Sequence, residues 1–391
     1  MLTSQIRGEG EGFMGRLKFL LVIFFLMGCS PTPAAISVTA PTQTDKKLIE
    51  YGWDVPTVSF IREHIEAMQQ RPFDGVAYKL TGDDVHPSSA FDSRPWTEAE
   101  LQLDTLAQIE WGRFNSNFIV LWASNPVTMN WFDDQRWEAI TANMRLFSKA
   151  LKVSKAIGVF FDPEFYAVRE THSLWLYTSE IYPTLNQAEV EVQVRKRGAQ
   201  FMTALQSEVD RIDFLSFYFL SEVVRRSESS GEANAYTHFD LLPAFIYGML
   251  ETAKPDIRFI DGNEPSYYFT SPEQYPAARE LIATKTTFFV AAELRPRYQQ
   301  QVRIANALYL DYLMALRPEH DRGLPWEDRL RWLEHNIYYS LQQSDAYVWL
   351  YSEHADWWNN DVSPDIEAAI IRAREKITKN EALGFEITIP P

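Results

Sequence analysis

Two carboxylates close an apolar segment of the chain, residues 158–164, with the sequence GVFFDPE. If this segment is extended, Asp162 and Glu164 point to the same side, because side chains two residues apart share a face of a strand. Pro163 cannot donate a hydrogen bond to a sheet and marks the end of the strand. Two neighbouring carboxylates raise the pKa of one of them, which suits a general acid. We therefore expect Glu164 to be a proton donor, and Asp162 to be its pKa partner or an acceptor for a substrate hydrogen bond.

Acids also follow other apolar segments, and they are Asp54, Glu222, Asp261, Glu264, Glu293 and Glu353. Hydrolysis of a glycosidic bond needs two carboxyl groups, one to protonate the leaving oxygen and one to attack the sugar or activate water. The catalytic partner of Glu164 is therefore expected to be Glu353, Glu293 or Glu264. Each acid has an alternative structural role, since it can cap a helix or pair with an arginine, as Glu293 can with Arg295.

Aromatic residues are numerous, with 12 Trp, 18 Tyr and 25 Phe. Several tryptophans lie in polar, loop-like contexts: Trp96, Trp131, Trp326, Trp357 and Trp358. Such rings either stack on the apolar faces of sugars or fill gaps beneath long loops. Together with nearby acids, the aromatic residues give a set of expected substrate-binding residues, namely Trp53, Asp54, Tyr166, Glu222, Asp261, Tyr351 and Trp357.

Eight short apolar segments recur along the chain with helical patterns between them. The segments are residues 47–54, 74–80, 117–123, 156–162, 213–219, 257–261, 286–292 and 345–351. The intervening helical patterns cover residues 56–70, 97–112, 133–152, 186–210, 239–253, 271–284, 298–316, 326–343 and 364–377. This alternation predicts an α/β fold, a single (β/α)8 TIM-type barrel with loop insertions after strands 4, 5 and 7, in which the strand ends share one rim. A doubly wound open sheet is the alternative. The sequence lacks the glycine-rich motif that the nucleotide-binding proteins of that fold carry.

The N-terminal residues have the pattern of an export signal. Arg16 and Lys18 precede a short apolar run that ends in Gly28-Cys29, and this run is short for a transmembrane span. The residues around Cys29 resemble a bacterial lipobox, in which the cysteine is lipidated; a plain secretory signal or an uncleaved anchor are the alternatives. We expect a lipoprotein signal peptide over residues 1–28, a flexible tether over 29–45 and the barrel domain over 46–391. The protein would then be anchored at Cys29 in the bacterial cell envelope, at the outer membrane or periplasmic face of a Gram-negative cell.

The net charge of −16 argues against nucleic acid and anionic membrane surfaces as partners, since both bind clustered Lys and Arg. We expect contact with the membrane through the lipid anchor only. The zinc motifs and the serine-nucleophile elbow are absent from the sequence, and Asp83-Asp84-x-His86 fits a polar loop better than a cation site. No metal and no cofactor are therefore expected.

The arrangement of acids after barrel strands resembles the (β/α)8 glycoside hydrolases over residues 46–378. In their largest clan a general-acid Glu follows strand four and a nucleophilic Glu follows strand seven, and the resemblance assigns these places to Glu164 and Glu293. Glu164 departs from that clan because Asn does not precede it. The Asp-x-Glu spacing also resembles families that cleave N-acetylhexosamine chains, in which the Asp orients the acetamide, but their longer acidic signature is missing here.

The resemblance implies a glycoside hydrolase-like enzyme that acts on a poly- or oligosaccharide by carboxylate acid/base catalysis, and it assigns no specific family. A barrel scaffold can also persist without its chemistry. The alternative is therefore a non-catalytic, glycan-binding or scaffolding envelope lipoprotein.

Overall fold

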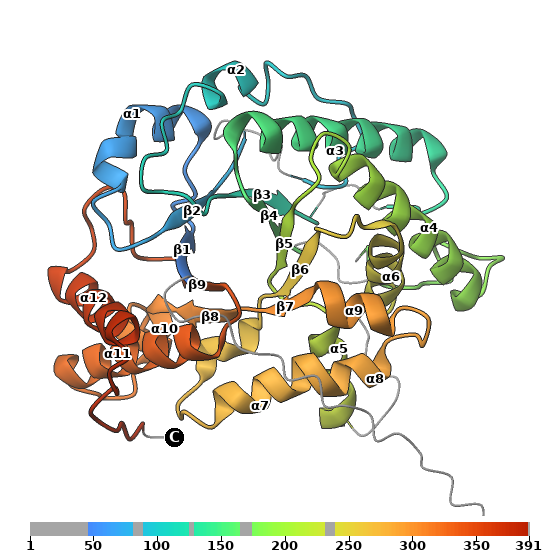
Figure 1. Cartoon of the computed structure of the whole chain (residues 1–391). Helices are drawn as coiled ribbons and strands as arrows, with labels where there is room; N and C mark the ends of the chain where they lie inside the picture. Colours follow the sequence, from blue (N-terminus) through green and yellow to red (C-terminus); the bar gives the residue numbers. More distant parts are fainter. Residues whose placement is uncertain (1–45, 81–88, 125–128, 165–173, 231–238, 390–391) are drawn as a thin grey trace, which may run out of the picture. The chain divides into compact units, whose positions relative to one another are not determined.

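Parallel strands form the inner ring of the molecule, and helices surround them (Figure 1). The structure is a computed structural model that describes residues 46–80, 89–124, 129–164, 174–230 and 239–389. Its strands follow the order β7-β6-β5-β4-β3-β2-β1-β9-β8 in one sheet, and neighbouring strands pair in parallel. Their bounds are β1 (Lys47–Gly52), β2 (Gly75–Tyr78), β3 (Phe118–Trp122), β4 (Gly158–Asp162), β5 (Asp213–Ser216), β6 (Arg258–Asp261), β7 (Val302–Ile304), β8 (Asn306–Tyr309) and β9 (Tyr347–Ser352).

The ring closes through β7 and β8, which are two halves of one extended segment separated only by Ala305. The first half pairs with β6, where Ile304 lies opposite Asp261, and the second half pairs with β9, where Asn306 lies opposite Val348. At the break, the Ala305 N–H donates to the Asp261 carbonyl at 2.9 Å. The nine strand pieces therefore occupy eight positions, and the predicted (β/α)8 barrel is confirmed.

Helices follow the strands in the order expected for βα units. They are α1 (Val58–Met68), α2 (Leu103–Leu106), α3 (Asp134–Ser154), α4 (Gln187–Leu205), α5 (Leu220–Ser230), α6 (Leu242–Thr252), α7 (Gln274–Glu280), α8 (Thr286–Phe289), α9 (Arg295–Gln301), α10 (Leu310–Met314), α11 (Trp326–Gln343) and α12 (Pro364–Lys379). The start of α4 is fixed by a capping box between Asn186 and Glu189, in which each side chain accepts from the other's backbone N–H. No helix among the described residues is long and apolar enough to cross a membrane.

The predicted seventh strand, residues 286–292, is wrong. Its first residues form α8, directly after the π-helix η4 (Leu281–Lys285). The hydroxyl groups of Thr286 and Thr287 donate to the carbonyls of Leu281 and Ala283 at 2.9 and 2.8 Å, and Phe288 is 70% exposed. The true seventh strand, β7 and β8, lies inside residues 298–316, where a helix was predicted. The helix predicted over 97–112 is also shorter than expected and is reduced to α2.

Four aromatic rings fill the barrel interior. Tyr51, Phe160, Phe217 and Trp349 come from β1, β4, the end of β5 and β9, and their ring centroids lie 4.9–6.3 Å apart in the contacting pairs. The Trp349 indole N–H donates to the Gly262 carbonyl at 2.9 Å, which fixes its ring. Because interiors are packed this tightly, the barrel has no open channel, and these rings form a floor beneath the strand ends.

A pair of buried carboxyl groups lies behind β1. Glu50 is fully buried, and no group other than Asp54 hydrogen-bonds to it in the described part of the chain. Burial, and next the charge of Asp54, raise the pKa of Glu50 well above its usual range. Burial also raises the pKa of Asp54 to about 6, although the Trp357 N–H donates to it at 2.8 Å. The folded protein therefore favours the protonated form of this pair.

This pair makes stability depend on pH. Carboxyl groups with raised pKa values contribute stability that is fully present below about pH 4 and is lost as the pH rises through their folded-state pKa values. We predict that Glu50→Gln raises the free energy of unfolding by about 1 kcal/mol or more at pH 8, since one pKa unit corresponds to about 1.4 kcal/mol. The gain should shrink towards pH 4. Urea unfolding between pH 4 and 9 measures this, with the exposed Glu63→Gln as control. Equal pH slopes in the wild type and Glu50→Gln would contradict the assignment.

Candidate functional site

Carboxylates from two strands meet at the carboxyl end of the barrel. Asp162 is the buried last residue of β4, and its Oδ1 accepts from the Glu164 N–H at 2.8 Å, which fixes the turn that carries Glu164. Glu264 opens the short helix η3 (Glu264–Tyr268) directly after β6, and its N–H donates to the Phe217 carbonyl at 3.1 Å. Both turns are therefore held by hydrogen bonds before any substrate binds.

Glu264 has a strongly raised pKa at this end of the barrel. Burial is the largest cause, and the negative charges of Glu164, Asp162 and Glu222 add to it, so that its pKa rises to about 8. The nearby guanidinium of Arg226 opposes this only in part. The carboxyl groups of Glu164, Asp162 and Glu222 therefore lie close enough to Glu264 for their charges to act on it. At neutral pH Glu264 is therefore mostly a neutral proton donor.

Four tyrosines surround the carboxylates: Tyr51, Tyr218 and Tyr267, which are buried, and Tyr351, which is half-buried. Burial is the first cause that raises the pKa of each phenol, and the charge of Glu164 contributes to all four. The rings of Tyr51 and Tyr267 stack on that of Tyr351, at 5.6 and 5.8 Å. The Tyr218 hydroxyl has no hydrogen-bond partner among the described residues. Low-polarity walls that carry a few hydroxyl donors are typical of ligand sites.

Glu353 follows β9 at the same end of the barrel, but its charge is compensated. It forms an ion pair with Arg317, and its Oε1 accepts from the Tyr351 hydroxyl at 3.0 Å. The Arg317 guanidinium also lies over the ring of Trp53, 5.6 Å from the centroid, and Trp53 is 66% exposed. Glu353 therefore belongs to the rim of the site, where it holds Arg317 beside an exposed aromatic ring.

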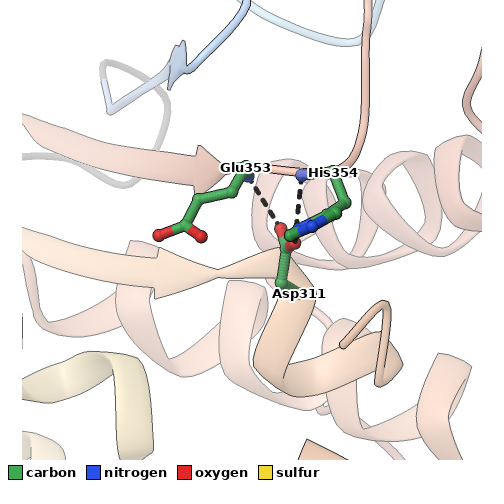
Figure 2. Close-up of side chains that lie close together, drawn as sticks. All are labelled: Asp311, Glu353 and His354. Carbon is green, nitrogen blue, oxygen red and sulfur yellow. Dashed lines mark hydrogen bonds and ion pairs between the residues drawn. The ribbon is translucent and has the colours of Figure 1, made fainter. Parts of the chain in front are cut away.

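Asp311 is a residue of this rim that the sequence analysis missed. It lies in α10, just after β8, and is fully buried. Figure 2 shows its carboxylate against the residues that follow β9: it accepts the N–H groups of Glu353 and His354 at 2.9 and 3.0 Å, and contacts His354 Nδ1 at 2.7 Å. The three side chains offer ligand atoms within 4.8 Å of one another. Asp311 already accepts two backbone N–H groups, and Glu353 pairs with Arg317. Asp311 therefore holds the backbone after β9 in place and so orients Glu353.

Glu293 lies away from these carboxylates, contrary to expectation. It sits between α8 and α9 because the segment before it is helical, and its side chain is 63% exposed. Its Oε1 lies 3.2 Å from Arg195 Nη2 on the outer surface. The place that the resemblance assigned to Glu293, after the seventh strand, belongs to Asp311 instead.

Three expected substrate-binding residues also point elsewhere. Asp54 turns back towards Glu50 and the backbone of Trp357, and Trp357 is buried against Phe73, with ring centroids 4.7 Å apart. Asp261 alternates with the inward-facing Arg258 on β6 and faces α5 instead, where Ser221 hydrogen-bonds to it. Their placement differs from the expected one because the bend after each strand, rather than sequence position, decides which acid enters the barrel mouth.

The remaining expected residues have varied surroundings. Glu222 lies near Glu264, but it pairs with Arg225 and Arg226 at 2.5 and 2.8 Å. Trp53, Tyr351 and Glu353 lie at the rim as described above. Tyr166 and the segment Asp83-Asp84-x-His86 lie outside the described residues, as do the expected signal peptide and tether. Trp96 and Trp131, which were possible sugar-stacking residues, are buried.

No protein-family model matches the chain, and no curated protein matches it. Solved structures with a similar fold include a GH5-4 broad-specificity endoglucanase from Clostridium longisporum, with a TM-score of 0.43, 8% identity and coverage of 81% of this chain and 86% of that one. Xylanase 10B from Thermotoga maritima has a TM-score of 0.43, 10% identity and coverage of 86% and 97%. The dihydropteroate synthase of Yersinia pestis is also similar, with a TM-score of 0.32, 6% identity and coverage of 88% and 98%. Similarity this distant carries no argument about activity.

Proposed function

We propose that the protein is a glycoside hydrolase-like enzyme that cleaves a poly- or oligosaccharide at the carboxyl end of the barrel. The observation that carries the proposal is the raised pKa of Glu264, about 8, beside Glu164 and Asp162. Two carboxyl groups that hold different protonation states in one site are what glycosidic bond cleavage requires. The exposed ring of Trp53 at the rim supplies an apolar surface on which a sugar ring can stack.

In this proposal Glu264 is the general acid. It gives its proton to the glycosidic oxygen as the bond from that oxygen to the anomeric carbon breaks, and the leaving sugar departs as an alcohol. Glu164 is the partner carboxylate, which either attacks the anomeric carbon or takes a proton from the water that does. Asp162 holds the Glu164 turn through its hydrogen bond to the Glu164 N–H. The negative charge of the Glu164–Asp162 pair favours the positive charge that develops on the sugar.

This assignment exchanges the roles that the sequence pattern suggested. The pattern favoured Glu164 as the acid because Asp162 lies beside it in the chain. Glu264, one of the expected partners, comes from another strand, and burial together with the charges of Glu164, Asp162 and Glu222 raises its pKa. Since the general acid must carry a proton near the operating pH, the carboxyl group with the raised pKa is the better donor.

Substitution of the two carboxylates tests the proposed chemistry. We predict that Glu264→Gln and Glu164→Gln each lower the hydrolysis rate by a factor of about 10² or more, because each removes an acid/base group. Release of reducing ends from neutral plant, bacterial and algal polysaccharides measures this. Glu293→Gln is the matched control and should keep full activity. Wild-type levels of hydrolysis in Glu264→Gln would refute the assigned acid. A chain that binds these glycans without cleaving any would support the non-catalytic alternative.

We also propose that the mature protein is a lipoprotein of the bacterial cell envelope, attached through Cys29. The proposal rests on the basic, apolar and small-residue pattern before this single cysteine. The polar, proline-rich residues 30–44 would then separate the barrel from the lipid.

Replacement of the cysteine tests the anchor. In a bacterial host we predict that the wild-type chain fractionates with membranes, and that Cys29→Ala moves most of the exported protein out of the mature, membrane-bound form. Labelling with a radioactive fatty acid should mark the wild type and the control variant Ser30→Ala, but not Cys29→Ala. Equal labelling of Cys29→Ala would contradict the proposal.

A further inference from the structure

A pocket lies outside the catalytic neighbourhood, between α10 and α11. Its volume is about 390 Å³, within the range of small-molecule sites. Its walls combine apolar side chains with one aromatic ring and two charged groups, namely Met314, Ala315, Leu316, Pro318, Leu324, Trp326, Asp321 and Arg329. Arg317, which pairs with Glu353 at the rim of the barrel, lies in the segment that connects α10 to α11. The pocket therefore lies on a segment that also borders the candidate active site.

Trp326 is the aromatic wall of this pocket. It is the first residue of α11 and is 39% exposed, whereas most tryptophans of the chain that share its polar sequence context are buried. Its Nε1 lies 3.3 Å from Asp365 Oδ2 at the start of α12. This contact orients the ring, so that a ligand that stacks on it need not order it first.

Arg329 and Asp321 are the polar wall. Arg329 is buried, and its Nη2 donates to Asp321 Oδ1 at 2.5 Å while its Nε donates to the Leu324 carbonyl at 3.2 Å. Its Nη1 has no hydrogen-bond partner among the described residues. A buried donor without a partner is costly, and a ligand oxygen in the pocket that this residue lines would reduce that cost after a small adjustment. The Asp321 carboxylate balances the charge of the guanidinium.

We propose that this pocket is a second glycan-binding site, which holds a neutral sugar unit without cleaving it. The fixed indole ring suits the apolar face of a pyranose, and the Arg329–Asp321 pair suits its hydroxyl groups. Because the two charges compensate each other, neither an anionic nor a cationic ligand gains a net Coulombic attraction. The proposal goes beyond the catalytic one, since the pocket contains neither Glu264 nor Glu164.

Affinity gel electrophoresis of the full chain tests this site. Barley β-glucan, konjac glucomannan and xylan serve as neutral probes, and polygalacturonate as the anionic one. All variants carry Glu264→Gln, which keeps the polymers intact, and Trp53→Ala, which weakens binding at the barrel mouth. We expect at least one neutral polymer to retard this parent protein, Trp326→Ala to weaken the retardation at least fivefold, and Trp326→Phe to retain most of it.

The matched control is Phe288→Ala, which removes an aromatic ring on α8 that is more exposed than Trp326 and should leave the retardation unchanged. Equal effects of Trp326→Ala and Phe288→Ala, retardation by polygalacturonate alone, or no retardation by any probe would each overturn the proposal. Binding is measured here without turnover. Failure of the second site therefore leaves the hydrolysis assay unaffected, and failure of the hydrolysis assay leaves this result unaffected.

Discussion

The hydrogen bonds of one extended segment hold the two edges of the sheet together. The segment from β7 to β8 gives its first half to β6 and its second half to β9, and the exchange takes place at Ala305. Without this closure β6 and β9 would be the edge strands of an open sheet. Unpaired edge strands are costly and prone to association. With it, residues that follow different strands, such as Glu264 and Glu353, face the same mouth.

Closure also determines the electrostatics of the site. The aromatic floor of Tyr51, Phe160, Phe217 and Trp349 excludes water from below, and the tyrosines beside the carboxylates lower the polarity of the walls. In such surroundings like charges interact strongly, so the cluster lowers its energy by keeping one carboxyl group protonated. Glu264 takes this role because it is both buried and close to the charges of Glu164 and Asp162. At the opposite end of the interior, the Asp213 carboxyl group accepts hydrogen bonds from Arg258 and the Tyr347 hydroxyl instead.

The apolar rhythm of the sequence predicted the barrel and seven of its strands, because buried parallel strands are short continuous apolar runs. The seventh strand was misplaced for a physical reason. Residues 286–292 contain Thr, Phe and Val, which favour strands, yet the threonine hydroxyls bond back to preceding carbonyls in a helix. The true strand contains Asn306, a poor strand former, whose side chain is satisfied by Asn263 and Ser344. Contacts between residues this far apart in the chain cannot be recognised from the local pattern of residue types. The same error hid Asp311, whereas Asp162, Glu164 and Glu353 followed correctly placed strands.

The proposed mechanism depends on Glu264 carrying a proton at neutral pH. Carbon-13 NMR titration of the glutamate side-chain carboxyl groups tests it directly, with the Glu264 signal assigned through Glu264→Gln. We predict that Glu264 titrates near pH 8 in the wild type. Glu164→Gln should lower this value, because it removes the negative charge that is the second-largest cause of the raised pKa. A Glu264 signal that titrates near its ordinary value of 4.5, or that does not respond to Glu164→Gln, would contradict the account.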